Sequence, residues 1–488
     1  MKTRRRWVAV VGVMMAFTLV VAACGDDDAV DTTATTTPPA TTEAVTTTEA
    51  PTTEAPTTEA PPTTEAVPDI AIGRGVTLEP CPDSANPDNG CIYLGVISDF
   101  SGPFAAFGLP LTWGKEDFWE RVNAGGGLMG FDVAITPENT IDAGYDGAAH
   151  LAGYEEIRGN VAALAESLGT LQTLGALPLM IEDSMVSPVS SWYSGWSFDD
   201  IDGGLILEAG TNYCLEAMNG FDFVMQARST MDPVGIPFTY AIVGFPGDYG
   251  GDYAAGVKIA AAAYADVGIG DPVAEFVYTP GVSTVEEAVA AILPVAPDVI
   301  FVTTGPNELA GLMGGLFGAG LQSAMYVGTG PTWHPALLGA ADGALVPLFE
   351  QAYFQTSQNA GFQDDTPGHQ AMREAFEAHE RGIPNLGYVA GWVMSYNLLA
   401  VLEQAIINKD LTPEGIAAAV GQVEAVDYEG MLPDKSFVGT PDQTVERGAV
   451  VHRVDATSPD GLAVIAPFFV GPTAAAYEFN APCLVLGG

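Results

Sequence analysis

The stretch IYLGVISDFSGP, residues 92–103, indicates how this chain folds. An apolar run over residues 92–97 leads into a polar loop that contains Gly102 and Pro103. Residues 111–123 then carry aromatic and apolar side chains at helical spacing. This order is typical of a buried strand, a loop and a helix that packs against the strand. Strands that alternate with helices in this way form parallel sheets, so the fold class expected is α/β.

The same unit recurs along the chain. Further strands are predicted at residues 161–164, 239–245, 298–302 and 325–327, followed by loops at 167–170, 246–251, 303–307 and 328–330 and by helices over 253–267 and 308–318. Ligands of parallel sheets bind at the carboxyl ends of the strands, so these loops are candidate binding segments. The globular part, about 400 residues, exceeds what one core usually supports, which predicts two lobes.

The first 24 residues resemble a bacterial lipoprotein signal. A basic start precedes the apolar stretch Trp7–Val20, which is too short for a membrane-spanning helix, and small residues then lead into Cys24. The resemblance implies that residues 1–23 are a signal peptide and that Cys24 carries a diacylglycerol. The protein would then be exported and anchored on the outer face of the cytoplasmic membrane. An ordinary signal peptide with an incidental cysteine is the alternative.

Residues 24–70 combine the expected acylated cysteine with a low-complexity segment. From Gly25 to about Pro68 the chain is rich in Thr, Glu, Ala and Pro, repeats Thr-Thr-Glu-Ala-Pro and contains no aromatic residue. Such a composition cannot bury enough apolar surface to offset its ordering entropy, which predicts a disordered tether. At roughly 3 Å per residue it could reach on the order of 100 Å, enough to cross a cell-wall layer.

Charge and cysteine content restrict the possible partners. The 488 residues include 61 acidic and 16 basic side chains, for a formal charge of -45, which argues against nucleic acid or anionic lipid as a partner. With Cys24 acylated, four cysteines remain and allow three pairings. The short polar loop between Cys81 and Cys91 favours a disulfide there, and Cys214 then pairs with Cys483 by default. Some of these could instead remain buried thiols.

Catalytic and metal-binding motifs are not found in the sequence. GGGLMG at residues 125–130 follows a helix and precedes a strand, the reverse of a dinucleotide-binding loop, so it predicts a helix end and a turn. Residues 108–116 fail the spacing of a phosphate loop, and no strand leads into Gly-x-Ser-x-Gly. The five histidines are scattered without paired ligand spacing. We therefore expect no enzyme activity, no metal and no cofactor.

The order of these blocks resembles a known family, the leucine/isoleucine/valine-type (branched-chain amino acid) substrate-binding lipoproteins of ABC transporters. The resemblance covers nearly all of residues 91–488. It is carried by SGPFAAFG at 101–108, NAGGG at 123–127, SLGT at 167–170, AIV at 241–243, DYG at 248–250, PD at 297–298, GAGL at 318–321 and GY at 387–388.

This resemblance implies a type I periplasmic-binding fold, with two Rossmann-like lobes joined by a three-crossing hinge and a ligand held in the cleft between them. By position, lobe one holds residues 91–211 and 352–430, and lobe two holds 212–351 and 431–488. The implied function is delivery of a small polar molecule, an amino acid or a related amide or carboxylate, to an ABC transporter permease. A ligand-sensing receptor of the same fold that signals to a membrane partner is the alternative.

In the family, the loops that correspond to residues 101–108 and 167–170 hold the ligand's carboxylate and backbone atoms, and N–H groups and hydroxyls at helix starts suit an anion. Ser167 and Thr170 are the strongest candidates, with ordinary helix capping as the alternative. With the residues suggested by the strand-end loops and by an aromatic pocket, the full set of predicted ligand contacts is Ser101, Gly102, Phe104, Ala105, Phe107, Ser167, Leu168, Gly169, Thr170, Trp192, Asp248, Tyr249, Asn307, Glu308 and Trp333.

The loop at residues 328–333 departs from the family's pattern. Amino-acid binders of the family place an acidic residue there to hold the ligand's ammonium group, whereas this loop has no carboxylate. Asp248 or Glu308 could take that role. Trp192 and Trp333 indicate a larger aromatic pocket, which argues against a free branched-chain amino acid as the ligand.

Overall fold

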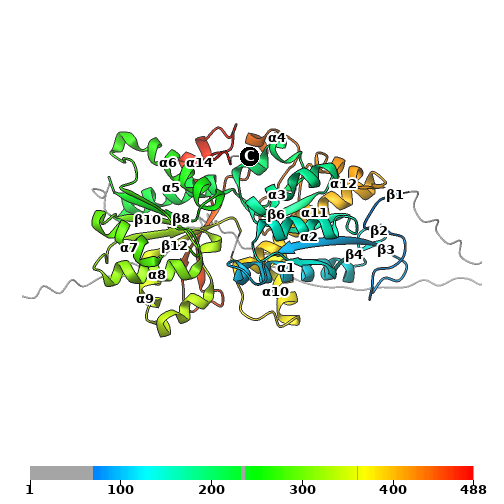
Figure 1. Ribbon diagram of the computed structural model, residues 1–488, viewed down its shortest axis with the longest axis horizontal. Coiled ribbons are helices and arrows are strands. Elements are labelled where there is room, and N and C mark those ends of the chain that lie inside the picture. The colour runs from blue at the N-terminus through cyan, green and yellow to red at the C-terminus, as the bar shows by residue number, and fades with distance from the viewer. Residues whose placement is uncertain (1–69, 232–236, 360, 487–488) are drawn as a thin grey trace, which may run out of the picture. The chain divides into compact units, whose positions relative to one another are not determined.

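The computed structural model describes residues 70–231, 237–359 and 361–486, which form two lobes, each built on a mostly parallel sheet (Figure 1). The α/β class and the two-lobed fold predicted from the sequence are confirmed. The expected signal peptide, Cys24 and nearly all of the expected tether lie outside the described residues.

Lobe one is built on a six-stranded sheet in the order β2-β3-β5-β6-β7, with β4 paired to β3. Its strands are β2 (Val76–Thr77), β3 (Gly90–Ser98), β4 (Phe131–Asp142), β5 (Ala163–Leu168), β6 (Ser187–Ser190) and β7 (Ile206–Leu207). Its helices are α1 (Ala105–Ala124), α2 (Gly147–Ile157), α3 (Thr170–Glu182), α4 (Asp199–Asp202), α10 (Pro367–Ala378), α11 (Leu386–Ile407) and α12 (Pro413–Val420). The short strands β1 (Ala71–Ile72) and β13 (Asp410–Leu411) pair with each other.

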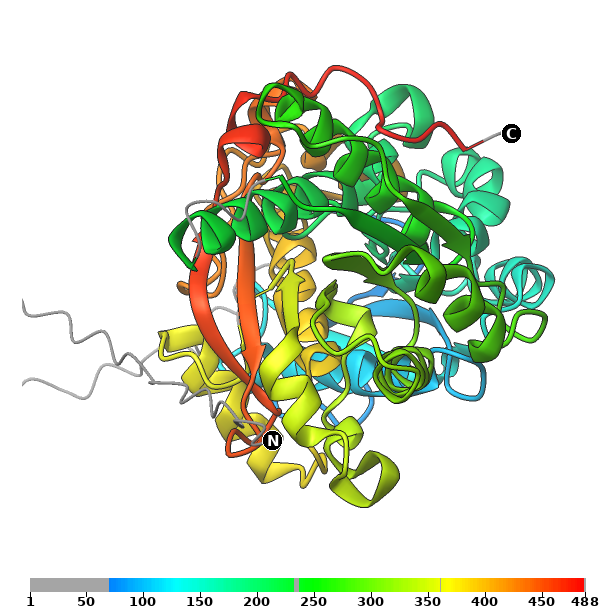
Figure 2. The ribbon, with the colours of Figure 1, turned by 90° about the vertical axis from the view of Figure 1, so that its left-hand side faces the viewer.

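Lobe two is built on a seven-stranded sheet in the order β15-β14-β12-β11-β10-β8-β9. Its strands are β8 (Tyr240–Gly244), β9 (Ala274–Val277), β10 (Val299–Thr303), β11 (Met325–Gly328), β12 (Tyr353–Ser357), β14 (Ala449–Val454) and β15 (Leu462–Phe469). Its helices are α5 (Tyr213–Met231), α6 (Asp248–Ala263), α7 (Val285–Ile292), α8 (Pro306–Gly318), α9 (Val346–Ala352), α13 (Pro441–Thr444) and α14 (Pro472–Ala476). Strands β14 and β15 are antiparallel and close one edge of the sheet (Figure 2).

The chain passes between the two sheets three times, after β7, after β12 and after α12. Strand β12 pairs with β11, with Tyr353 opposite Tyr326, so residues 353–357 belong to the sheet of lobe two. The sequence had placed 352–430 in lobe one, and this boundary is therefore corrected to follow Ser357. The backbone hydrogen bonds of β12 with its neighbours β11 and β14 continue to Ser357, so the whole strand belongs to lobe two.

Several predicted elements are confirmed, with shifted ends. Strand β3 contains residues 92–97 and helix α1 contains residues 111–123. Helix α6 begins at Asp248, five residues before its predicted start at Tyr253, because Gly247 at φ 83° turns the chain and Asp248 suits the positive end of the helix dipole. Helix α1 ends at Ala124 before the turn with positive φ at Gly126 and Gly127, as the interpretation of GGGLMG predicted.

Helices α1 and α11 cross at very short range in the core of lobe one. A side chain at Gly391 would place its Cβ 1.9 Å from the carbonyl oxygen of Leu111, so glycine is required at this crossing. Helix α11 is long and apolar enough to span a membrane, but 72% of its most apolar window is buried inside the protein. It is therefore the central core helix of this lobe.

Both favoured disulfides are present. Cys81 is bonded to Cys91 across 10 residues, beside strand β3. Cys214, on α5, is bonded to Cys483 across 269 residues, which holds the C-terminal segment against lobe two. No described histidine, cysteine, aspartate or glutamate belongs to a cluster of three that could hold a metal ion.

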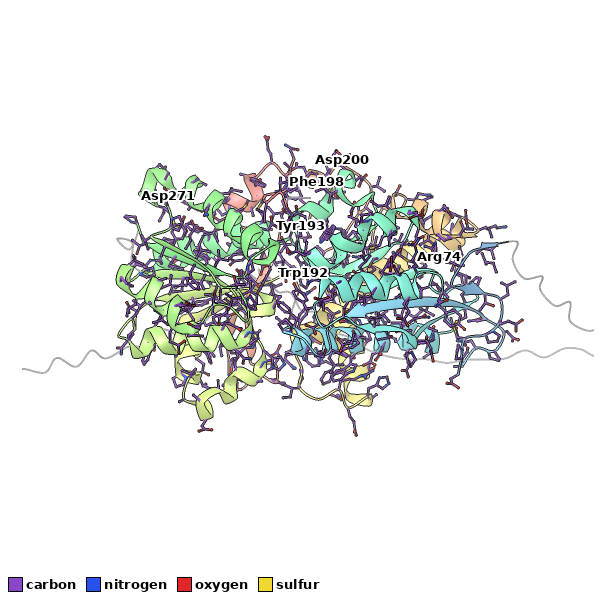
Figure 3. All side chains as sticks on the ribbon, viewed as in Figure 1. Arg74, Trp192, Tyr193, Phe198, Asp200 and Asp271 are labelled. Carbon is purple, nitrogen blue, oxygen red and sulfur yellow. A yellow bond between two sulfur atoms is a disulfide. The ribbon has the colours of Figure 1, made fainter. Side chains whose placement is uncertain are left out.

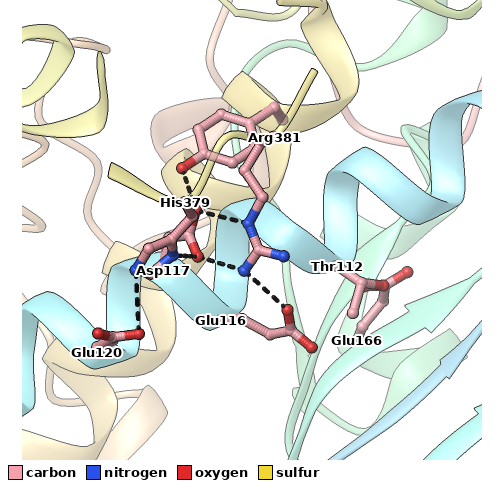
Figure 4. A network of polar contacts seen from close by, with 8 residues as sticks. Thr112, Glu116, Asp117, Glu120, Glu166, His379 and Arg381 are labelled. Atoms are coloured by element: carbon pink, nitrogen blue, oxygen red, sulfur yellow. Dashed lines mark hydrogen bonds and ion pairs between the residues drawn. The ribbon is translucent and has the colours of Figure 1, made fainter. Parts of the chain in front are cut away.

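A buried carboxylate ties the segment between α10 and α11 to helix α1 (Figure 4). Asp117 is fully buried and accepts hydrogen bonds from Arg381, at 2.5 and 3.1 Å, and from the hydroxyl of Tyr388, at 2.6 Å. The Nδ1 atom of His379 lies 2.6 Å from the same carboxylate. Glu120 contacts His379 at 3.5 Å from the surface, where its side chain is 68% exposed.

Asp117→Ala is expected to lower the free energy of unfolding by about 3–5 kcal/mol, because it leaves the half-buried Arg381 and the Tyr388 hydroxyl without their acceptor. Glu120→Ala removes a charge from the same network at its exposed edge, and its cost is expected to stay below about 0.5 kcal/mol. Denaturant unfolding of both variants measures the difference. Equal losses would show that Asp117 does not hold the two helices together.

Candidate functional site

A cavity lies between the lobes, where the carboxyl ends of both sheets meet. Its lining residues come from four segments of lobe one and three of lobe two: Phe104, Phe107, Tyr145, Leu168, Gly169, Thr170, Ser190, Ser191, Trp192, Tyr213, Asp248, Tyr249 and Pro331. Trp192 lies between the two sheets in Figure 3. The cavity has a volume of about 30 Å³, room for no more than a few water molecules, so the lobes must part before a solute enters.

Aromatic rings form a continuous wall around this cavity. The ring of Phe104 lies 4.5 Å from that of Tyr145 and 6.4 Å from that of Tyr249. Tyr249 in turn lies 5.2 Å from Tyr213, and Trp192 lies 6.0 Å from Tyr213 and 6.2 Å from Phe107. The polar groups of two of these side chains bond within the protein. The Trp192 indole N–H donates to the carbonyl of Ala209, and the Tyr249 hydroxyl contacts threonines of lobe two. Trp192 and Tyr249 therefore offer a ligand their ring surfaces.

Thr170 and Asp248 make a direct polar contact across the cleft. The Thr170 hydroxyl, at the start of α3, donates to the carboxylate of Asp248, at the start of α6, and also contacts the Ser191 hydroxyl. Burial raises the pKa of Asp248 to about 6, while the hydrogen bond from Thr170 acts in the opposite direction. Among the described residues that line the cavity, Asp248 is the only one with a carboxylate. No lysine, arginine or histidine lines the cavity among them, so no basic side chain neutralises that charge.

The loop before α1 is occupied by a carboxylate of the protein itself. Asp99 is fully buried and accepts hydrogen bonds from the backbone N–H groups of Ser101, Gly102 and Phe104, at 3.2, 2.5 and 2.7 Å. These are N–H groups that the family resemblance had assigned to the ligand's carboxylate. Asp99 therefore satisfies three of the donors expected to bind an anion.

Eight of the fifteen predicted contact residues line the cavity: Phe104, Phe107, Leu168, Gly169, Thr170, Trp192, Asp248 and Tyr249. Ser101, Gly102, Ala105, Ser167, Asn307, Glu308 and Trp333 do not line it. Ser167 is the clearest difference, because its hydroxyl lies 3.0 Å from His150 and 2.7 Å from Thr173, inside lobe one. It belongs to strand β5, where successive side chains point to opposite faces, and not to the loop that follows.

Sequence reasoning missed several lining residues. Tyr145 follows strand β4, and the rule that ligands bind at the carboxyl ends of strands could have found it. Ser190 and Ser191 end and follow strand β6 in the same way. Tyr213 begins α5 directly after the first crossing, and no local motif marks it.

A smaller cavity of about 20 Å³ continues the cleft on the other side of Phe104 and Phe107. It shares these two rings and Pro331 with the first cavity, and its remaining wall includes Trp333 and Leu386. Burial lowers the pKa of His334, which also lines it, so this histidine is neutral near pH 7. Trp333, predicted as a ligand contact, lies in this apolar extension.

A second set of polar contacts fastens the lobes together outside the cavity. Asp252 of α6 is fully buried and accepts hydrogen bonds from the backbone N–H of Ser194, at 2.8 Å, and from its hydroxyl, at 2.6 Å. The backbone N–H of Cys483 donates to that same hydroxyl, and Tyr193 donates to the carbonyl of Leu484 at 2.8 Å. The C-terminal segment therefore contacts both lobes, and the structure represents a closed state.

Two lobes that close over a cavity lined from both sides define a protein that binds a solute. The chain belongs to the family of periplasmic binding proteins, whose model matches residues 91–459. The members of this family are solute-binding proteins and not enzymes. No curated protein matches the chain by sequence.

Solved structures agree with this fold. A fatty acid ABC transporter substrate-binding protein from Thermomonospora curvata superposes with a TM-score of 0.73 at 24% identity, covering 85% of this chain and 98% of that one. A branched chain amino acid ABC transporter protein from Thermus thermophilus with bound valine gives 0.63 at 15% identity, covering 79% and 98%. At these identities the likeness establishes the fold and not the ligand.

Closure is expected to weaken as the pH rises. Burial raises the pKa of Asp252 to about 7, whereas in separated lobes the exposed carboxyl group has its usual value near 3.9. Its protonated form therefore favours the closed state, most below about pH 4, and this contribution is lost as the pH rises to about 7. Asp252→Asn keeps a neutral hydrogen-bonding group and should weaken this pH dependence, leaving the part due to Asp248, whose pKa burial raises to about 6, as measured by small-angle scattering.

The exposed Asp271, on the same lobe, provides the control (Figure 3). Asp271→Asn changes the net charge by the same amount and should leave the dependence on pH as it is in the unaltered protein. A closed fraction that is independent of pH before any substitution would contradict the assignment to Asp252.

Proposed function

We propose that the protein is a lipid-anchored solute-binding subunit, exported to the outer face of the cytoplasmic membrane. It captures a small polar molecule in the cleft between its lobes and delivers it to the permease of an ABC transporter. The observation that carries this proposal is the cavity lined by Thr170 and Trp192 from lobe one and by Asp248 and Tyr249 from lobe two. A site divided between two lobes couples ligand binding to closure, and closure is what a permease can recognise.

Family membership supports the delivery step, and the basic and apolar start of the chain that leads to Cys24 supports the anchor. The sequence favours an amino acid or a related amide or carboxylate as the solute. The lobe boundaries proposed are those of the two sheets, with the second crossing after Ser357.

Substitutions in the two lobes are expected to affect binding differently. Thr170→Val removes the hydroxyl that donates to Asp248 across the cleft, so the closed state that holds the solute loses a buried hydrogen bond and affinity should weaken roughly five- to 150-fold. Tyr249→Ala should chiefly speed dissociation, because its ring contacts the solute only after closure. Calorimetry and stopped-flow fluorescence measure these effects.

Ser167→Ala is the matched control, since it removes a buried hydroxyl three residues away that does not line the cavity. The affinity of this variant should stay within about threefold of the unaltered protein. That change is smaller than the roughly fivefold loss at the lower end of the range expected for Thr170→Val. A larger loss from Ser167→Ala than from Thr170→Val would place the solute elsewhere.

The anchor is tested by Cys24→Ala. Without the thiol no diacylglycerol can be attached, so the protein should be released from membranes or remain uncleaved, as shown by fractionation and by the mass of its N-terminal peptide. Solute binding, measured on the same preparation, should be unchanged. Full membrane retention with a mature start at another residue would refute lipidation.

A further inference from the structure

The charge of the cavity restricts what it can hold. Asp248 is 6% exposed, lies in the cavity wall, and no basic side chain lines the cavity among the described residues. A buried carboxylate without a counter-charge is costly, and a second carboxylate, brought by a ligand, would add repulsion at short range. The cavity is therefore unsuited to an anionic head group.

The hydroxyl groups beside Asp248 are already committed to it. Trp196 donates its indole N–H to the Ser191 oxygen at 2.9 Å, Ser191 contacts Thr170, and Thr170 donates to Asp248. Each hydroxyl has one hydrogen to give. With the Thr170 hydrogen used on Asp248, that of Ser191 is directed to the Thr170 oxygen. These hydroxyls have no hydrogen left to donate to a ligand's carboxylate.

The other expected anion site is also filled, because Asp99 accepts the backbone N–H groups of Ser101, Gly102 and Phe104. Asp99 therefore takes three backbone donors of the first loop, and Asp248 takes the Thr170 hydroxyl of the second. What remains for a ligand is a carboxylate acceptor surrounded by aromatic rings.

That combination suits a positive charge. Six aromatic side chains line the cavity with Asp248: Phe104, Phe107, Tyr145, Trp192, Tyr213 and Tyr249. The face of an aromatic ring attracts an ammonium group within about 6 Å, most strongly where water is excluded. Most side chains that line the smaller cavity behind Phe104 and Phe107 are apolar, so this side of the head group suits a hydrocarbon substituent once the lobes have parted.

We infer that the cleft recognises an organic cation, an amine or alkylammonium with an apolar substituent, whose positive charge is held by Asp248 and the surrounding rings and which needs no carboxylate. This inference rests on the proposed solute-binding function and narrows its solute class. An amino acid would bind this site only through its ammonium group, and a simple carboxylate would not bind it.

Ligands that share one hydrocarbon skeleton and differ only in charge test the inference. Phenethylamine keeps the ammonium group of phenylalanine without its carboxylate, and hydrocinnamate keeps the carboxylate without the ammonium. Hexylamine and hexanoate make the same comparison on an alkyl chain. Calorimetry on the full mature protein should show the two amines binding at least about tenfold more tightly than the two carboxylates, with phenylalanine no better than phenethylamine.

Asp248→Asn separates the charge from the shape of the site. It should weaken binding of phenethylamine roughly 10- to 150-fold and leave hydrocinnamate unchanged or improved. Asp266→Asn, at an exposed position after α6, removes the same charge from the surface and should change neither. The comparison of ligands on the unaltered protein does not depend on how the variants fold.

The opposite results would overturn the inference. Binding of hydrocinnamate or hexanoate to the unaltered protein that is as tight as binding of the matching amine would show that the cleft does not select a positive charge. If only neutral or anionic solutes bind from a wide set of small molecules, the inference fails and the solute-binding function stands. If no solute of any charge binds, the proposed function itself fails.

Discussion

The amino-terminal ends of helices α1, α3 and α6 meet at the cleft. Each end carries a partial positive charge on N–H groups that need an acceptor from a nearby side chain or a ligand. In many proteins such ends bind an anion supplied by a ligand. Here Asp99 takes the N–H groups that precede α1, and Asp248 sits at the start of α6 and reaches Thr170 at the start of α3. The chemistry left for the ligand follows from this internal pairing.

The same pairing couples binding to lobe closure. Thr170 and Asp248 belong to different lobes, as do Ser194 and Asp252, so both contacts exist only while the lobes are together. Closure buries both carboxylates, and this burial raises the pKa to about 6 for Asp248 and about 7 for Asp252, although the hydrogen bonds from Thr170 and Ser194 act in the opposite direction. When no cation is present to neutralise these carboxylates, closure is therefore favoured by their protonation. A cationic solute would replace the proton at Asp248.

The prediction from sequence succeeded where the signal was local. Strand β3, helix α1 and the glycine turn after it follow from apolar spacing and from the conformational freedom of Gly126 and Gly127. Ser167 was predicted to lie in the loop that faces the cleft, but strand β5 runs to Leu168. Because successive side chains of a strand point to opposite faces, that of Ser167 points into lobe one. Asp99 was not recognised as the acceptor of the α1 loop, because its hydrogen bonds depend on how the loop closes.

The sequence by itself determined the alternation of strands and helices and the number of lobes, and it favoured the cysteine pairing that the structure shows, because hydrophobic period, length and parity are properties of short segments or of the whole chain. Only the tertiary structure decided which residues face the cleft. Tyr145, Trp192 and Tyr213 come from separate segments and form one aromatic wall, and Thr170 meets Asp248 from 78 residues away. Side-chain direction at the end of each strand, and the approach of one lobe to the other, set these contacts, and no local pattern contains that information.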